Sequence, residues 1–255
     1  MQLNLIGMGT LYKRETWRFL KVWNQTLVAP MITTLIFLAI LALAMGGNTR
    51  LVHGVPFTQF IAPGLIMMAM VQNAFANTSS SFMIAKLQGV IIDWLMPPLS
   101  AAELGMGFAL GGVTRGLMVG CTVGLAMSFF VPLQLASLGY LLFFAVMATL
   151  MLALLGLLTG IVSETPDQSA AITNFFITPL SFLSGTFYSI HDLPGVWQKV
   201  SHANPFFYMI DGFRYAMLGS SDADPHIGMA VLLGANLLLF ALAYRMLKKG
   251  WRLKS

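Results

Sequence analysis

A run of 48 residues, from position 116 to position 163, contains no Asp, Glu, Lys or Arg. As one continuous α-helix it would extend about 72 Å, whereas the hydrocarbon core of a bilayer is about 30 Å thick. The run must therefore fold back on itself, and residues 131–134, VPLQ, mark the turn because proline ends a helix. The sequence predicts two spans here, at about residues 105–130 and 135–161.

The whole chain is too apolar for a soluble globule. Of its 255 residues 57% are hydrophobic and 9% are charged, whereas about a quarter are charged in soluble domains. Further runs of about the 20 residues that a span needs occur at about residues 27–45, 57–82, 170–190 and 227–247. We predict an all-α polytopic membrane protein, a single transmembrane domain over residues 1–255 with six transmembrane helices. Basic and aromatic residues interleave at positions 13–23, which favours an amphipathic N-terminal helix at the membrane interface.

The 14 Lys and Arg residues lie mostly near the two ends of the chain, so the net charge of +5 indicates topology. No nucleic-acid partner is expected. Six spans place both termini on one side of the membrane. Ten of the basic residues fall on that side and three on the other, with Arg115 inside a span. Because Lys and Arg accumulate in cytoplasmic loops, both termini are expected in the cytoplasm.

The second predicted span becomes polar in its later half, where Gln72, Asn73, Asn77 and Ser80 occur. A lipid-facing helix would not tolerate this row, so we expect it to meet another helix or a cavity. Two interpretations stay open: the row lines a transport pathway, or it makes helix-packing contacts. Arg115 in the third span is assigned a structural role, either reaching the membrane surface or pairing with Glu103.

Residues 86–97, KLQGVIIDWLMP, predict a short amphipathic helix on the cytoplasmic side that ends at a proline pair. The residues singled out are the apolar face and its charged rim: Lys86, Val90, Ile91, Asp93, Trp94 and Leu95. Such a helix can enter a groove on a partner protein. The alternative is a membrane-surface helix that its Trp anchors.

Residues 193–213, between the fifth and sixth spans, carry many large apolar side chains. Left in water, each would forgo roughly 1.5–3 kcal/mol of burial. About 20 residues are too few to cross a membrane and return. We therefore predict an external re-entrant segment of two short helices, broken at Asn204-Pro205, with Asp211 and Arg214 paired on one helix face. The alternative is an ordinary loop at the membrane interface.

Several kinds of chemistry are missing from the sequence. No GxxxxGK[ST] phosphate-binding loop exists, which excludes nucleotide hydrolysis by that route, and the four His residues form no metal-binding motif. We expect no catalytic residues, no metal and no cofactor in this chain. Cys121 lies in an apolar run and is expected to pack. Asp211 is the one serious candidate for an ion-coupling acid, so an ion-coupled secondary transporter or channel is the alternative function.

The motif FLSGTFY at residues 182–188 precedes the last span. The accompanying features are Leu193-Pro194, Asn204-Pro205, Tyr208, Arg214, PGLIMMAM at residues 63–70 and the pair Arg115-Gly116. Over nearly the whole chain this arrangement resembles the type-2 permease family of ATP-binding-cassette (ABC) transporters. The resemblance implies a membrane subunit of a bacterial exporter in the cytoplasmic (inner) membrane, moving a lipid, glycan or drug-like amphiphile.

The resemblance also implies partners and roles. Two copies of a separate ATPase subunit would carry the ATP and Mg, and two permease subunits would form a homodimer in membrane lipid or pair with a sister permease. Residues 86–97 would be the helix that couples to the ATPase. The external segment would be a gate, and its candidate residues are Gly185, Tyr188, Pro194, Asn204, Pro205, Tyr208, Asp211 and Arg214.

Overall fold

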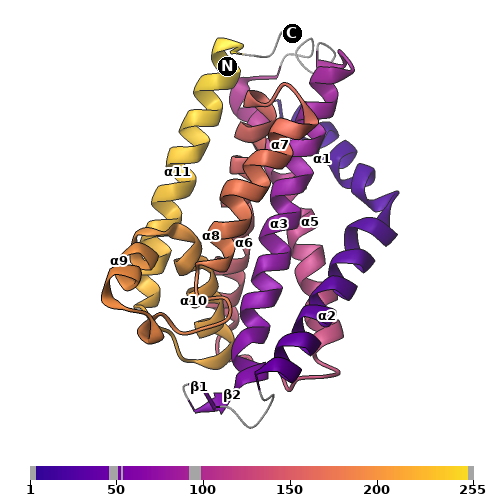
Figure 1. Ribbon diagram of the computed structural model, residues 1–255. Helices are drawn as coiled ribbons and strands as arrows, with labels where there is room; N and C mark the ends of the chain where they lie inside the picture. The colour runs from indigo at the N-terminus through magenta and orange to yellow at the C-terminus, as the bar shows by residue number, and fades with distance from the viewer. Residues whose placement is uncertain (1–3, 46–50, 53, 92–98, 252–255) are drawn as a thin grey trace.

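The computed structural model describes residues 4–45, 51–52, 54–91 and 99–251. It is a bundle of long helices, with a short antiparallel pair, β1 (Leu51–Val52) and β2 (Val55–Pro56), at one end (Figure 1). The opposite end holds the start of α1 (Leu5–Leu20) and the last turn of α11 (Pro225–Lys249). We call these the hairpin end and the terminus end.

α3 (Phe57–Leu87) runs through the centre of the bundle, between α5 (Ala101–Met127) and α6 (Leu138–Val162). Glycines on both neighbours allow this close approach. A Cβ on Gly112 of α5 would lie 3.0 Å from the carbonyl oxygen of Ala74, and one on Gly156 of α6 would overlap the carbonyl of Phe75. The three helices therefore pack backbone against backbone, as small residues permit in membrane proteins.

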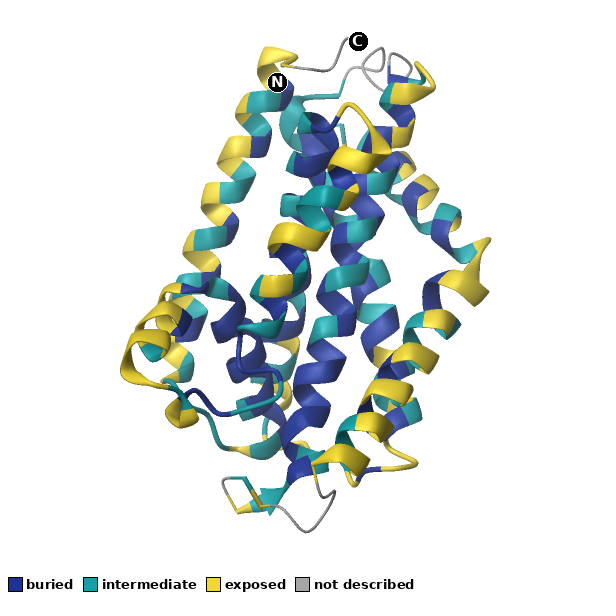
Figure 2. Cartoon of the chain, viewed as in Figure 1, coloured by how far each residue is buried: buried dark blue, intermediate teal, exposed yellow. Residues whose placement is uncertain are grey.

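The outer helices expose apolar side chains (Figure 2). α2 (Ala29–Ala44) follows a π-helix, η1 (Asn24–Val28), and exposes Ile36 and Ile40. α11 exposes Leu237 and Leu238. Within the described residues, five helices are long and apolar enough to cross a membrane: Asn24–Ala44, Phe57–Leu87, Ala101–Met127, Leu138–Val162 and Pro225–Lys249. Each coincides with a predicted span to within five residues at either end.

The segment predicted as a fifth span, residues 170–190, differs from the prediction. Its helix consists of α7 (Pro166–Ile172), a π-helix η3 (Thr173–Ile177) and α8 (Thr178–Phe182), and it ends eight residues early. Residues 183–189 are irregular, and Gly185 adopts a left-handed conformation with φ of 71°. A continuous helix of 17 residues rises only about 26 Å, so it is shorter than the five spanning candidates.

A short 3-10 turn, η4 (Ile190–Asp192), leads into two short helices, α9 (Gly195–Ala203) and α10 (Pro205–Leu218). They meet at Asn204-Pro205, where the sequence predicted a break. α10 is almost wholly buried against α6, α3 and α11, whereas most of α9 is exposed. Both helices lie in the half of the bundle toward the hairpin end (Figure 1).

Candidate transport site

One face of α3 holds a polar ladder that reaches α1. Ser81 donates from its hydroxyl to Glu15 Oε1 at 2.8 Å, and Arg18 Nη2 lies 3.2 Å from Glu15 Oε2. Arg18 Nη2 also donates to the carbonyl and the side-chain oxygen of Asn77, at 2.8 and 2.9 Å. Glu15 and Asn77 are fully buried. The sequence left two interpretations for the polar row of the second predicted span, a transport pathway or helix packing. At Asn77 the row makes a contact between helices.

The ladder continues one helical turn closer to the hairpin end, at Asn73. The Oδ1 of Asn73 accepts from Arg115 Nη2 of α5 at 3.0 Å. Arg115 thus has a partner on α3. Glu103 instead forms a capping box with Ser100 at the start of α5 and accepts from the backbone N–H of Asn4. These bonds join the starts of α1 and α5 at the terminus end.

A neighbouring face of α3 borders a cavity of about 470 Å³ between this helix and residues 166–178. The polar residues along it are Gln72, Asn73, Ser79, Ser80, Ser169, Thr173 and Thr178. Three of the four candidate pathway residues therefore line one cavity, and Asn73 stands at the corner between the cavity and the ladder. Hydroxyl and amide groups of this kind can bind polar groups of a ligand by hydrogen bonds.

The proposed coupling residues are distributed differently from the expectation. Lys86 belongs to the last turn of α3, and its Nζ donates to the carbonyl oxygens of Ile161 at 2.7 Å and Ser163 at 2.9 Å, at the end of α6. Ile91 is 5% exposed and packs in an apolar cluster, with Val90 against it. These three residues thus contact the bundle itself, because α3 continues through Leu87 before it turns. Asp93, Trp94 and Leu95 lie outside the described residues.

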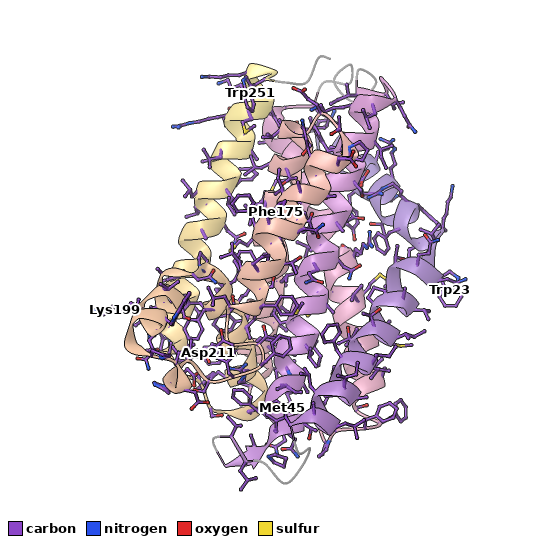
Figure 3. All side chains as sticks on the ribbon, viewed as in Figure 1. Trp23, Met45, Phe175, Lys199, Asp211 and Trp251 are labelled. Carbon is purple, nitrogen blue, oxygen red and sulfur yellow. The ribbon has the colours of Figure 1, made fainter. Side chains whose placement is uncertain are left out.

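Three of the candidate gate residues, Gly185, Asp211 and Arg214, meet at α10. Arg214 is 1% exposed, and its Nη2 donates to the carbonyl oxygen of Gly185 in the irregular segment. Its Nη1 lies 3.7 Å from Asp211 Oδ1, and the guanidinium carbon lies 4.1 Å from the centre of the Phe60 ring on α3. Figure 3 shows Asp211 within the bundle, whereas Lys199 of α9 points outward. One buried cation thus joins α10, α3 and the segment after α8.

Asp211 holds a second connection. Its two carboxylate oxygens accept from the backbone N–H groups of Asp222 and Ala223, both at 2.9 Å. Asp222 in turn accepts from Ser189 Oγ and from the backbone N–H of Ile190, both at 2.8 Å. The loops on either side of the α9–α10 pair are therefore tied to each other through two carboxylates.

Asn204 fixes the turn between α9 and α10. Its Oδ1 accepts from the N–H of Phe206, capping α10, and its Nδ2 donates to Ser184 Oγ at 3.0 Å. Pro205 occupies the first turn of α10, where a missing N–H has no cost.

The remaining candidates lie around this turn. Tyr208 is buried beside Ile190, Tyr188 is half-buried, and Pro194 precedes α9 at the exposed surface.

Two residues of the ladder, Glu15 and Arg18, were missed by the sequence reasoning. A signal for them existed, since Leu11, Glu15 and Phe19 are spaced four apart and share one buried helix face. An acid on such a face needs a buried partner.

Comparison with known proteins identifies the family. The model of the ABC-2 type transporter family matches residues 7–218. The chain belongs to this family. It is 37% identical to the inner membrane transport permease YadH of Escherichia coli (strain K12) over 255 residues, covering all of both chains. It is 23% identical over 227 residues to nodulation protein J of Rhizobium meliloti, covering 84% of this chain and 86% of that one.

A second nodulation protein J, from Rhizobium leguminosarum bv. trifolii, is 26% identical over 228 residues and matches 86% of this chain and 87% of its own. ABC-2 permeases are the membrane subunits of transporters and are not catalysts themselves. Together with the five apolar helices, membership makes the chain a multi-pass inner-membrane protein and indicates a permease subunit of an ABC transporter.

Proposed function

We propose that this chain is the permease subunit of an ATP-driven exporter that moves a lipid, glycan or drug-like amphiphile by alternating conformations. One observation carries the proposal. A cavity lined by apolar side chains and by several hydroxyl and amide groups lies beside residues 166–178, toward the terminus end, while in the hairpin half the α9–α10 pair covers the irregular backbone that follows α8. Irregular backbone at membrane depth is tolerated where protein covers it or where it lines a pathway.

In this proposal residues 166–189 form a sixth crossing, in which the helix of residues 166–182 is followed by the irregular chain of residues 183–189. Residues 193–213 then re-enter the outer half of the membrane. The positive-inside pattern then places both termini in the cytoplasm. The cavity would face the cytoplasm, its hydroxyl and amide groups would bind the polar group of the cargo, and the Arg214–Asp211 network would close the outer end. Release would require α9–α10 to move as a gate.

The buried acids favour ATP-driven transport over ion coupling. Within the described residues of α1, the spans and α10, Glu15 binds Ser81 and Arg18, Glu103 caps α5, and Asp211 accepts two backbone N–H groups. A coupling acid must release and bind ions during transport. Acids that hold helices and loops together are poorly suited to that role.

The energy would come from a separate ATPase, present in two copies that carry ATP and Mg, docked on two permease copies. Two identical permease subunits are the simplest assembly. In the alternative assembly this chain pairs with a sister permease. Trp94 and Leu95 would enter the ATPase groove, because the neighbouring Val90 and Ile91 already pack on the bundle. Rigid-body docking of this kind transmits movement without local chemistry.

Leu95→Glu is expected to abolish co-purification with the ATPase. A buried anchor in an interface contributes about 3 kcal/mol, which corresponds to more than a hundredfold in affinity. The measurement is pull-down of the co-expressed ATPase, followed by ATPase activity in lipid. Leu51→Glu is the matched control, since Leu51 is 64% exposed at the opposite end. Normal pull-down and activity of the Leu95→Glu complex would remove this docking site.

The transport class has a separate test. The purified chain alone in liposomes should hydrolyse no ATP. An imposed proton or sodium gradient should not drive cargo transport by this chain. Gradient-driven movement by the isolated chain would replace the exporter proposal with an ion-coupled transporter.

A further inference from the structure

The polar ladder between α1, α3 and α5 has more hydrogen-bond donors than acceptors. Three buried nitrogens in it, Arg18 Nε, Arg115 Nε and Asn77 Nδ2, have no acceptor within the described residues. The ladder holds two guanidinium groups and one carboxylate, Glu15, so its net charge is +1. The two guanidinium groups bind Asn77 and Asn73, which lie one turn apart on α3. Buried donors without acceptors are costly, so this cluster favours an additional anion.

The depth of the ladder identifies where such an anion would come from. Asn77 is 20 residues along α3 from Phe57, which lies at the hairpin end. At 1.5 Å per residue this is about 30 Å, the thickness of a hydrocarbon core. If Phe57 marks the outer boundary, Asn77 and Arg18 lie at the level of the inner-leaflet headgroups.

The surroundings of Arg18 agree with this depth. Trp17 and Trp23 are 65% and 55% exposed, and Trp23 points away from the bundle (Figure 3). Exposed Trp side chains are enriched at membrane–water interfaces. The side chain of Arg18 itself is 34% exposed, so it can be reached from the surface of the bundle. A ligand in the inner leaflet would meet this arginine before the deeper Arg115.

We propose that Arg18, Arg115 and Asn77 form a binding site for a phosphate group, supplied by an anionic phospholipid of the inner leaflet. The phosphate would approach the exposed part of Arg18, and rotation of this guanidinium would bring its buried Nε to a phosphate oxygen. The charge of the phosphate would offset the second guanidinium. Arginine suits this ligand because its planar fork can donate two parallel hydrogen bonds to a phosphate. The site would hold α1 against α3 when such a lipid is present. It is independent of the ATPase and of the cargo.

The test is the thermal unfolding of the purified chain in a neutral detergent, titrated with three probes. The probes are dioctanoyl phosphatidylglycerol, dioctanoylglycerol, which lacks the phosphate, and inorganic phosphate. A ligand that binds the folded state raises the unfolding temperature in a concentration-dependent way. We expect phosphatidylglycerol to raise it and dioctanoylglycerol not to. If inorganic phosphate also raises the unfolding temperature, the phosphate site is supported and its ligands include free phosphate.

Variants separate this site from general charge attraction. Arg18→Gln and Arg115→Gln should each weaken phosphatidylglycerol binding at least tenfold, whereas Lys21→Gln, which removes an exposed charge from the end of the same helix, should not. Asn77→Asp places a second carboxylate inside the ladder, which supplies the missing acceptor and negative charge. This variant should therefore unfold at a higher temperature without lipid, and phosphatidylglycerol should no longer raise that temperature. An equal shift in unfolding temperature with dioctanoyl phosphatidylglycerol and with dioctanoylglycerol would overturn the proposal. So would wild-type affinity in the Arg18→Gln and Asn77→Asp variants.

Discussion

Replacing Gly156 by alanine is expected to lower the free energy of unfolding by about 3 kcal/mol, the upper part of the usual range for an overpacked core. The new Cβ would overlap Thr78 Oγ1 and the carbonyl of Phe75. Thr78 could rotate only by giving up its hydrogen bond to the carbonyl of Ala153, at 2.7 Å. Phe75 presents backbone, which cannot move aside unless α3 moves. The whole contact between α3 and α6 must therefore open.

The measurement is thermal unfolding in detergent, with Gly234→Ala as the control. Gly234 lies within α11, and a Cβ there would meet nothing within 4 Å. That variant should be neutral or gain up to about 1 kcal/mol, because alanine favours a helix more than glycine does. Gly156→Ala with wild-type stability would contradict the close packing of α3 and α6.

Arg214→Leu is expected to cost about 3–5 kcal/mol, the range for removing one partner of a buried charged pair. The substitution leaves the carbonyl of Gly185 without its donor and Asp211 without its cation. The segment after α8 should then separate from α10. We expect a lower unfolding temperature and faster proteolysis within residues 183–189.

Two further variants identify the cause. Arg214→Lys keeps the charge but loses the planar fork that reaches both Gly185 and Asp211, so it should recover only part of the stability. Lys199→Leu removes an exposed charge on α9 and should be neutral. Proteolysis of Arg214→Leu at the wild-type rate would show that this arginine does not hold the segment.

The helices could be read from the sequence where the constraint is local. The run without charged residues, interrupted at Pro132, predicted spans at 105–130 and 135–161, and the helices cover Ala101–Met127 and Leu138–Val162. Bilayer thickness and one proline suffice for this inference. The break after Phe182 could not be read in the same way, because residues 183–189, LSGTFYS, contain no proline and no charged residue and so continue the uncharged run. Their irregular backbone is stabilised by distant groups, namely Arg214, Asn204 and Asp222.

The site was predictable only in part for the same reason. Composition marked the later half of α3 as polar, but it could not separate Asn77, which binds Arg18, from Ser80, which borders the cavity. Likewise Lys86 looked like the rim of a surface helix, and its bonds to the end of α6 depend on a neighbour 75 residues away. Pairing on α10 was predictable, since Asp211 and Arg214 lie three apart on one helix.

The proposal that α9 and α10 re-enter the membrane is tested most directly by labelling single cysteines in intact membranes. The background is Cys121→Ala, and a membrane-impermeant thiol reagent is added outside. Positions on α10 are uninformative because protein covers them. Val196, Trp197 and Val200 of α9 are 74%, 50% and 42% exposed in the structure, so the described residues of this chain do not cover them and lipid is expected to protect them. If α9 and α10 re-enter the membrane, these three positions are protected while Asp192, which is exposed at the edge of the segment, is labelled. Labelling at all three as fast as at Asp192 would mean that α9 lies in water, and it would contradict the gate.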